Sequence, residues 1–379
     1  MLLAGCLSLV AATVIFGSLS VRHEQQYVRL AESFLNGKLY FISMPEHWQD
    51  TAAYGVRHYW PLGPLPAVIL MPLVSLFRLA GASFYQGYVS VVLSLWTGLL
   101  CFRLCQRCHR AKAESGWLTL AFCGSSSYLS VAVISMSWPF AQVIAIVLIF
   151  LALHEWLGHR RWWLIGLLIG LTATARISAG LNILLYAAAA LLQAREQKSK
   201  LVLPVMAGFA VPMVFLAAYN FFRFDSVFET GYKYQLPATG DFADTSLANV
   251  IPHLSIFLFG LPMASYRFPF VATNPFGMSV FLLSPWLVYL GWLKIDRFSG
   301  LALMNCAIVL LAVLAWRSTG QLQVGYRFSL DFLPIIVFLL ARDGFGGREI
   351  SAGFKILTVA GVFSTLYFLK SFIEMIPQG

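Results

Sequence analysis

Acidic, histidine and aromatic side chains gather in one polar stretch near the start of a chain that is otherwise strongly apolar. Residues 21–63 hold four of the 16 carboxylates and three of the seven histidines. A bilayer penalises ionisable groups, so acids that lie just outside apolar segments indicate chemistry or ligand binding. A carboxylate in this position has the chemistry of a general base, which takes the proton from a hydroxyl group as that group attacks.

The first candidate base is the pair His23-Glu24, which follows the first apolar segment. Apolar residues then recur at helical spacing as far as Asn36-Gly37, a pair that favours the left-handed end of a helix. Two interpretations stay open. Either Glu24 acts as a base with His23 beside it, or Glu24 is an acidic first-turn residue favoured by the helix dipole and His23 is an interfacial side chain.

The second candidate base is Asp50, in the segment Glu46-His47-Trp48-Gln49-Asp50 that precedes Tyr59 and Trp60. Aromatic faces with a few hydrogen-bonding groups suit sugar rings, which are apolar on one face and hydroxylated at the rim. The same residues are also typical of the Trp/Tyr belt at a membrane interface. The sequence leaves both interpretations open.

Three arginines could hold a phosphate group, because a planar guanidinium matches phosphate oxygens. These are Arg176, Arg223 and Arg327. Arg223 ends an apolar segment and is followed by Tyr232-Lys233, and Arg327 precedes another apolar segment. For Arg223 the structural alternatives are a pair with Asp225 or a side chain that extends from its helix end to the membrane surface. For Arg327 the alternative is a pair with Asp331. Arg176 lies between two apolar segments, where an arginine is costly unless it is paired or near water.

Composition places the chain in a membrane. Of its 379 residues 59% are hydrophobic and 11% are charged, against roughly 25% charged in soluble domains, and the mean hydropathy is +0.76. The net charge of +10 comes largely from short loops between apolar segments, as the positive-inside rule expects, and does not indicate nucleic acid as a partner. We expect no cofactor and no metal. Membrane lipids are the surrounding partner.

The spacing of apolar segments predicts an all-α polytopic membrane protein. Apolar segments cover residues 2–20, 64–82, 84–104, 117–135, 139–156, 162–175, 177–193, 201–221, 247–262, 276–293, 300–316, 328–341 and 353–372. The strongest basic clusters are Arg103/Arg107/Arg110/Lys112, Arg160/Arg161, Arg195/Lys198/Lys200 and Arg342/Arg348. All four can face the cytoplasm if the proline-containing segments 64–82 and 247–262 do not fully span. This predicts about eleven spans in one domain, 1–379, with the N-terminus inside, the C-terminus outside, and large outer loops at 21–83 and 222–275.

Other motifs contribute little. Cys105-Gln106-Arg107-Cys108-His109 matches the c-type haem attachment pattern, but it is solitary and lies in a predicted cytoplasmic loop. The chain has no Walker-type phosphate loop, no Rossmann fingerprint and no nucleophile elbow. ATP-driven transport and cytosolic nucleotide-sugar chemistry therefore lose support.

With these residues in place, the chain resembles the lipid-phosphosugar-dependent membrane glycosyltransferases of the GT-C fold, including bacterial mannosyl- and aminoarabinosyl-transferases. The resemblance covers most of the chain as a layout. Those enzymes have an outer loop opening with Asp-Glu-x-x-Tyr and a helix ending near glycine, then a Tyr-x-Pro-Pro-Leu-like segment and a membrane-lying helix. Here the corresponding segments read His23-Glu24-Gln25-Gln26-Tyr27 up to Gly37, then Tyr59-Trp60-Pro61-Leu62 before residues 64–82.

The resemblance implies a bundle of about eleven transmembrane helices, with interfacial helices in the outer loops. It implies sugar transfer from a polyprenyl-phosphate donor to a glycan, lipid or protein acceptor, with inversion, at the extracytoplasmic face of a bacterial inner membrane. Glu24, Asp50 or His23 would supply the base, and Arg327 with Arg223 or Arg176 would stabilise the departing phosphate. The aromatic residues expected to contact substrate are Tyr27, Trp48, Tyr59, Trp60 and Tyr232.

The chain departs from the family pattern at two points. His23 stands where the family has its catalytic aspartate, and residues 135–139 lack the second acid usual in the next outer loop, which disfavours a metal-dependent version. The rival interpretations are a transporter or flippase for a lipid-linked or anionic substrate, and a non-catalytic subunit of an envelope-glycan complex. Transporters favour inverted repeats, and the sequence contains no internal repeat.

Overall fold

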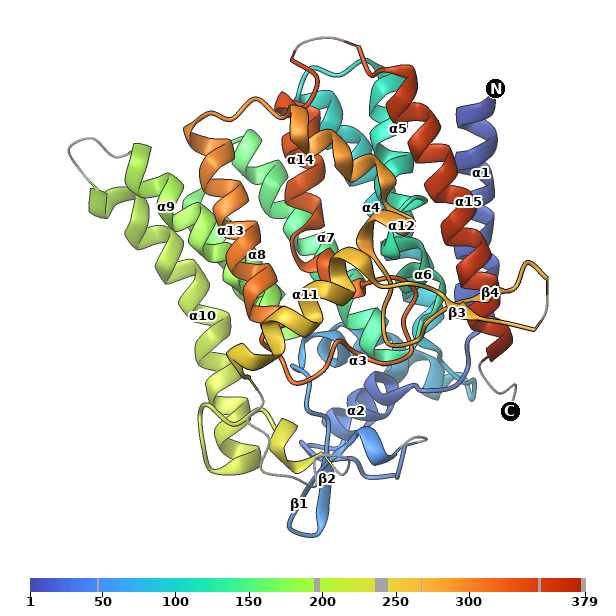
Figure 1. Cartoon of the computed structure of the whole chain (residues 1–379). Coiled ribbons are helices and arrows are strands. Elements are labelled where there is room, and N and C mark those ends of the chain that lie inside the picture. Colours follow the sequence, from blue (N-terminus) through green and yellow to red (C-terminus); the bar gives the residue numbers. More distant parts are fainter. Residues whose placement is uncertain (46–47, 194–197, 236–244, 267, 347–348, 376–379) are drawn as a thin grey trace. The chain divides into compact units, whose positions relative to one another are not determined.

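The structure, a computed structural model, describes residues 1–45, 48–193, 198–235, 245–266, 268–346 and 349–375, and these are mostly helical (Figure 1). Glu46, His47, Arg195 and Arg348 lie outside the described residues. The α-helices are α1 Leu2–Ser20, α2 Gln26–Leu35, α3 Leu65–Leu79, α4 Gln86–Arg107, α5 Lys112–Cys123, α6 Ser127–Val133, α7 Ser137–Leu157, α8 Trp162–Ala175, α9 Ile183–Gln193, α10 Lys198–Phe224, α11 Val250–Phe259, α12 Val280–Leu283, α13 Arg297–Leu314, α14 Leu333–Asp343 and α15 Ala352–Met375.

The remaining elements are short. The 3₁₀ helices are η1 Trp48–Asp50, η2 Ser178–Asn182, η3 Tyr232–Tyr234, η4 Leu247–Asn249, η5 Pro285–Trp292 and η6 Arg327–Asp331. Two antiparallel hairpins complete the set: β1 Ala52–Tyr54 with β2 Arg57–Tyr59, and β3 Met263–Ala264 with β4 Val271–Ala272.

Among the described residues, six helices are long and apolar enough to cross a membrane: α1, α4, α7, α10, α13 and α15. The pair α5 and α6 would make a seventh span, broken by a 69° bend. Helices α3, α8 and α11 and the segment 178–193 are apolar but shorter. At 1.5 Å per residue, a helix needs about 20 residues to cross the hydrocarbon. The all-α class is therefore confirmed, and these helices support a membrane protein, whereas the count of about eleven spans is not confirmed.

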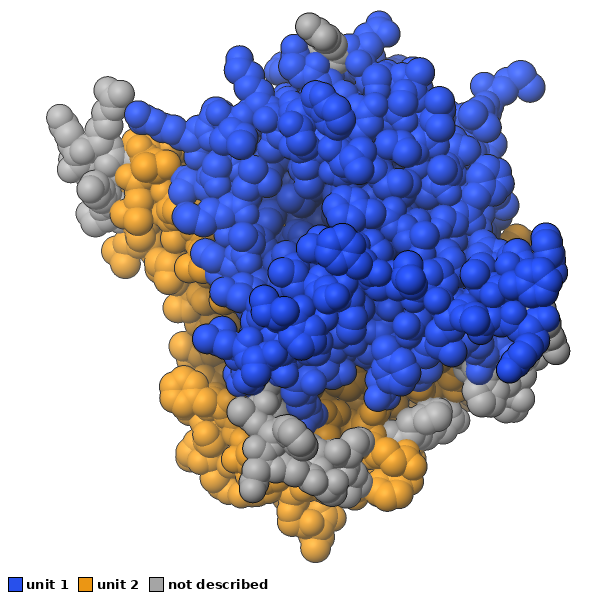
Figure 2. Space-filling view, viewed as in Figure 1, with its two compact units in different colours: residues 1–15, 95–133, 245–379 blue, residues 16–94, 134–244 orange. Residues whose placement is uncertain are grey.

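The chain forms two compact units, which are coloured separately in Figure 2. Unit 1 contains residues 1–15, 95–133 and 245–379, and unit 2 contains residues 16–94 and 134–244. Each unit therefore combines segments from distant parts of the sequence. The first polar stretch, residues 21–63, belongs entirely to unit 2.

In unit 2, α8 and α10 pack side by side through glycine (Figure 1). A Cβ atom on Gly166 of α8 would lie 1.9 Å from the carbonyl oxygen of Val205, and one on Gly208 of α10 would lie 2.0 Å from that of Trp163. Only glycine permits so close an approach of two helix backbones, as is common between helices in membranes.

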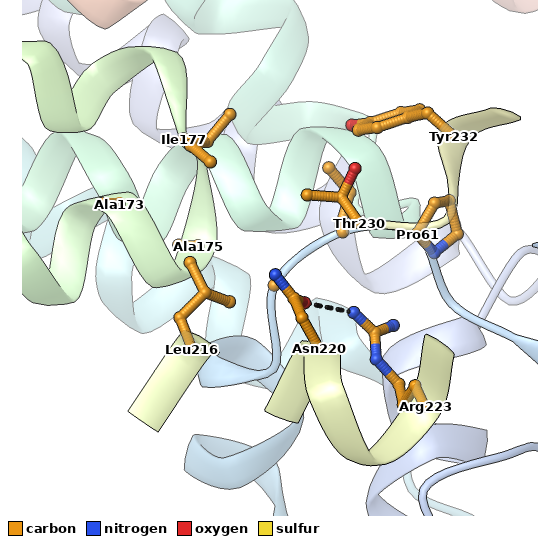
Figure 3. Close-up of a pocket in the computed structure, with 11 residues that line it drawn as sticks. Pro61, Ala173, Ala175, Ile177, Leu216, Asn220, Arg223, Thr230 and Tyr232 are labelled. Atoms are coloured by element: carbon orange, nitrogen blue, oxygen red, sulfur yellow. Dashed lines mark hydrogen bonds between the residues drawn. The ribbon is translucent and has the colours of Figure 1, made fainter. Parts of the chain in front are cut away.

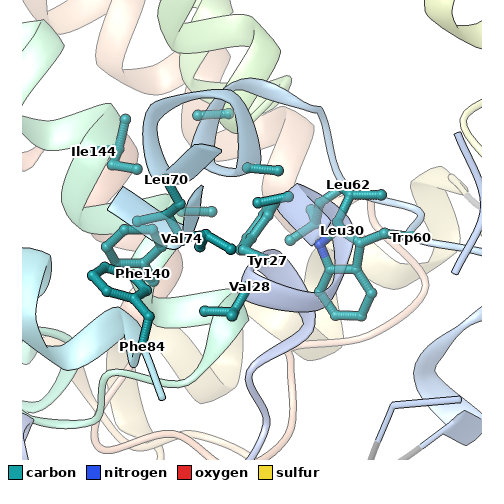
Figure 4. Packing of buried hydrophobic residues seen from close by; sticks show 14 of the residues in the cluster. Tyr27, Val28, Leu30, Trp60, Leu62, Leu70, Val74, Phe84, Phe140 and Ile144 are labelled. Carbon is teal, nitrogen blue, oxygen red and sulfur yellow. The ribbon is translucent and has the colours of Figure 1, made fainter. Parts of the chain in front are cut away.

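A second packed region of unit 2 joins α2, α3 and α7. Its buried core includes Tyr27, Val28, Leu30, Trp60, Leu70, Val74 and Phe140 (Figure 4). The apolar face of α2 supplies the first three of these residues, in agreement with the helical spacing of the sequence. Gly37 follows α2 with φ +66, so the predicted left-handed stop after this helix is confirmed.

In unit 1, the break between α5 and α6 is stabilised by side chains from other elements. The indole nitrogen of Trp286 donates to the carbonyl of Ser125 at 2.7 Å, and the hydroxyl of Ser125 donates to the carbonyl of Leu283 at 3.1 Å. Where a helix breaks, backbone carbonyls lose their partners within the helix, and here the Trp286 indole supplies a new partner for the carbonyl of Ser125.

Candidate functional site

The polar stretch of unit 2 is held by Gln86, the first residue of α4, whose side chain is fully buried. Its amide nitrogen donates to the carbonyl of Ser135 at 3.0 Å, and its amide oxygen accepts from the backbone nitrogen of Tyr27 at 3.1 Å and from the hydroxyl of Ser137 at 3.0 Å. Its backbone nitrogen donates to the side chain of Gln25 at 2.8 Å. One side chain thus fixes the start of α2 against the start of α7.

Glu24 lies inside this junction. Its carbonyl accepts from the backbone nitrogen of Ser137 at 3.2 Å and lies 2.8 Å from the hydroxyl of Ser137, whose single proton this carbonyl shares with the amide oxygen of Gln86. Only 5% of Glu24 is exposed. Glu24 has φ +52 and precedes α2, which begins at Gln26 and has no acid in its first turn. The interpretation of Glu24 as a first-turn residue of the helix is therefore wrong. His23, which precedes it, is partly exposed.

Asp50 is the more accessible of the two acids. It ends η1, is partly exposed, and its carboxylate accepts from the indole nitrogen of Trp138 at 3.4 Å, a long hydrogen bond. Its backbone carbonyl accepts from the side chain of Gln235 at 2.8 Å. Two adjacent residues at the start of α7 thus contact the two candidates: Ser137 binds the backbone of Glu24, and Trp138 binds the carboxylate of Asp50.

The aromatic candidates divide by burial. Tyr27, Tyr59 and Trp60 are packed in the interior, with exposed fractions of 4% or less. Burial raises the pKa of the Tyr27 hydroxyl well above its ordinary value, so this group stays protonated. Trp48 is 44% exposed and Tyr232 is partly exposed. Trp48 and Tyr232 are therefore the ones that keep surface for a ligand.

Trp138 connects the aromatic residues around Asp50. Its ring centroid lies 5.2 Å from that of Trp60 and 6.3 Å from that of Tyr232. Rings at these separations make favourable tilted contacts. Trp138 and Tyr232 together form an aromatic wall, which adjoins Asp50 at Trp138.

Arg223, near the end of α10, clamps the loop that carries Trp60. Its guanidinium donates to the carbonyl of Trp60 at 2.6 Å and to the side chain of Asn220 at 2.8 Å, and it lies 3.8 Å above the ring of Tyr219. The expected alternative, a pair with Asp225, is not formed; Asp225 instead accepts from the hydroxyl of Tyr54 at 3.4 Å. The described contacts of Arg223 use three of its five N–H groups.

The other cations occupy different environments. Arg176 caps the end of α8 and is 7% exposed. Its positive charge lowers the pKa of the Tyr27 hydroxyl, an effect smaller than the rise caused by burial. Lys233 forms an ion pair with Glu229 at 2.8 Å, and the hydrogen bond between them raises the pKa of Lys233. Arg327 belongs to unit 1, on η6, and is likewise 7% exposed. Arg176 and Arg223 are the candidate phosphate ligands that share unit 2 with Glu24 and Asp50.

A small cavity of about 30 Å³ adjoins the clamp and is lined by Gly63, Leu216, Asn220, Arg223, Thr230 and Tyr232, among others. Asn220 and Arg223 come from α10, while Thr230 and Tyr232 come from the segment that follows it (Figure 3). The cavity is large enough for a water molecule. A Cβ atom on Gly63 would lie 1.9 Å from the carbonyl of Thr174, so this wall of the cavity requires glycine.

A much larger apolar groove of about 700 Å³ lies in the same unit, between α2, α3, α8 and α10. Its walls are formed mainly by Phe34, Leu65, Val68, Met71, Leu167, Leu171, Val211, Phe215 and Leu216. Leu216 also lines the small cavity. Along α10 the groove extends from Val211 to Tyr219, which corresponds to about 12 Å.

The groove is also lined by two polar side chains, and one of them, Tyr219, lies beside Arg223. Tyr219 lines it and is 8% exposed, and among the described residues its buried hydroxyl has no hydrogen-bond partner. Lys38, in the loop after α2, lines the groove as well and is exposed. An apolar groove whose lining includes a hydroxyl and a cation suits a long amphipathic molecule with an anionic head.

Within the described residues, no group of three or more histidines, cysteines or acids is placed to hold a metal ion. Cys105 of the haem-like motif is buried inside α4.

Comparison with family models, with curated proteins and with solved structures finds no match. The function of the site is therefore argued from its geometry.

Sequence reasoning missed four residues that organise this site: Lys38, Gln86, Trp138 and Tyr219. Gln86 had a detectable signal, since it is a lone polar side chain at the start of an apolar segment. Trp138 lies before a proline in a short turn between two apolar segments. Tyr219 and Lys38 had no such signal, because their position on the groove depends on how distant helices pack.

We predict that Tyr219→Phe leaves thermal stability in detergent unchanged or raises it, because a buried hydroxyl without a partner costs about 1–3 kcal/mol. Tyr186→Phe is the matched control. Tyr186 is fully buried, its hydroxyl likewise has no partner within the described chain, and it does not line the groove. A clear loss of stability in Tyr219→Phe alone would mean that this hydroxyl has a structural partner.

Proposed function

We propose that the protein is an integral membrane glycosyltransferase of the GT-C type. It takes a sugar from a polyprenyl-phosphate donor and transfers it to an acceptor hydroxyl at the extracytoplasmic face of a bacterial inner membrane. The observation that carries the proposal is that the apolar groove and the cavity at Arg223 share Leu216, and that Tyr232 of this cavity contacts Trp138, which binds Asp50, all within unit 2.

The polyprenyl-phosphate donor would bind with its lipid chain in the groove and its sugar towards Asp50. Its polyprenyl chain occupies the groove between α3, α8 and α10, where the lining is almost entirely apolar. Its phosphate lies near Tyr219, Lys38 and Arg223. Its sugar then reaches the partly exposed Trp138 and Tyr232. Charge-assisted hydrogen bonds from lysine and arginine are the usual means of holding a phosphate in such a setting.

The chemical step is a direct displacement. Asp50 takes the proton of the acceptor hydroxyl, whose oxygen attacks the anomeric carbon from the side opposite the phosphate. The bond between the anomeric carbon and the phosphate oxygen breaks, and the lipid phosphate leaves with the electron pair. Cationic groups stabilise the charge that develops on that oxygen. The configuration at the anomeric carbon is inverted.

Burial favours Asp50 over Glu24 as the base. A bulky acceptor must reach the carboxylate, and Asp50 is partly exposed while Glu24 is 5% exposed. Glu24 instead orders the start of α2 through its carbonyl. Arg223 takes part in phosphate binding only through N–H groups not already bound to Trp60, Asn220 and Tyr219.

We predict that Asp50→Asn lowers sugar transfer by roughly 10²–10⁴-fold with little change in stability, because a positioned base contributes about that factor. The assay is transfer from a polyprenyl-phosphate sugar in lipid vesicles. Glu24→Gln is the comparison and should retain more activity. Full activity in both variants would remove both proposed bases, and donor binding without transfer in the wild type would identify a non-catalytic subunit.

We predict that Val211→Trp weakens donor binding and raises KM, because the indole fills the groove. Val214→Trp is the matched control: it lies on the same helix, is 66% exposed and does not line the groove. Binding of a polyprenyl phosphate to the purified protein is the direct measurement. Equal affinity in the two variants would place the donor elsewhere.

The finer topology is also part of the proposal: about eleven crossings, with α8 and the segment 178–193 crossing as shorter apolar helices and α3 and α11 lying at the interface. This places Arg22 on the extracytoplasmic side of the membrane and Lys112 on the cytoplasmic side. We expect an impermeant thiol reagent added to intact cells to label Arg22→Cys and not Lys112→Cys. The reverse pattern would invert the site and exclude an extracytoplasmic acceptor.

A further inference from the structure

A second feature, in unit 1, is the hairpin formed by β3 and β4. Its tip carries exposed aromatic residues: Tyr266 and Phe268 are exposed by 104% and 86%, and Phe270 by 61%. The rings of Phe268 and Phe270 contact each other with centroids 5.9 Å apart. In Figure 1 this hairpin projects sideways past α15. Large aromatic side chains displayed together in this way mark a contact surface.

The base of the hairpin is fixed to the last turns of α15. The backbone nitrogen of Thr273 donates to the hydroxyl of Ser371 at 3.1 Å, and the hydroxyl of Thr273 donates to the carbonyl of Phe368. On the β4 side, the hydroxyl of Tyr367 donates to the carbonyl of Val271. The hairpin is therefore held at the same height along α15 as residues 367–371.

That level is the end of a membrane-spanning helix. Helix α15 has 24 residues and is apolar enough to cross the bilayer. Near its end Lys370 and Glu374 are exposed and form an ion pair at 3.8 Å. Charged side chains at the end of a span extend to the headgroups, and aromatic side chains are enriched at the same depth.

The chemistry of the tip selects lipid over a strand-pairing protein partner. Strands β3 and β4 have two residues each, and the backbone nitrogen of Ser265 already donates to the carbonyl of Phe270 at 2.9 Å. So short a ladder offers little edge to pair with another chain. Aromatic side chains, by contrast, gain from burial at the boundary between headgroups and acyl chains without any partner backbone.

We infer that the β3–β4 hairpin is an interfacial anchor, which inserts Tyr266, Phe268 and Phe270 into the leaflet in which α15 ends. The anchor fixes the depth of this end of unit 1 in the bilayer. It is independent of the proposed sugar transfer.

The test uses an environment-sensitive fluorophore on a Phe268→Cys variant of the full chain in phospholipid vesicles. Native thiols label poorly, because five of the six cysteines are buried and burial raises the pKa of Cys108 to about 12; the unsubstituted chain gives this background. Lys112→Cys, at the exposed start of α5, is the aqueous reference. Phe363→Cys, 62% exposed in the middle of α15, is the hydrocarbon reference. Tyr266→Cys is the second variant.

We expect the emission of the label at Phe268→Cys to lie between the two references. Nitroxide lipids labelled near the headgroup should quench it more than those labelled near the chain end. Emission and iodide quenching equal to those of Lys112→Cys would overturn the inference, since the tip would then be in water. Protection from both iodide and nitroxide lipids would overturn it too, because protein would then cover the hairpin.

Discussion

The candidate site depends on one buried amide, the side chain of Gln86. A buried amide must satisfy both its donors and its acceptor, and here it does so with groups from the start of α2 and from the turn before α7. The position of the first polar stretch follows from this. Glu24 is held against Ser137, and the next residue, Trp138, then reaches Asp50. Removing the amide would take this partner from the backbone carbonyl of Ser135 and from the backbone nitrogen of Tyr27.

Residues that are equivalent candidates in the sequence differ in how far the structure buries them. Glu24 and Asp50 are both acids in the same stretch, yet only Asp50 keeps exposed surface beside an aromatic wall. For Arg223 the sequence allows a phosphate ligand or a partner of Asp225, and in the structure its guanidinium donates to a backbone carbonyl rather than to the aspartate. A buried guanidinium needs several acceptors, and a loop carbonyl and Asn220 supply them. Its contribution to a ligand is thus limited to the remaining N–H groups.

The fold class and some of the individual helices could be predicted from the sequence. The apolar segments, the helix that ends before Gly37 and the shortness of α3 and α11 all follow from local composition. The count of about eleven spans is not confirmed, because apolar segments such as 117–135 and 276–293 are broken into shorter helices. Hydropathy measures preference for lipid, and helix length depends on breaks that packing determines.

The sequence by itself determined that this is an all-α membrane protein with a polar, aromatic stretch after its first helix, since both properties are sums over neighbouring residues. Only the tertiary structure decided which side chains meet. Tyr219, Lys38 and Val68 lie far apart in the chain and line one groove, and Trp60 and Arg223 are joined by a hydrogen bond across 163 positions. Such contacts depend on the packing of distant helices, which no local pattern specifies.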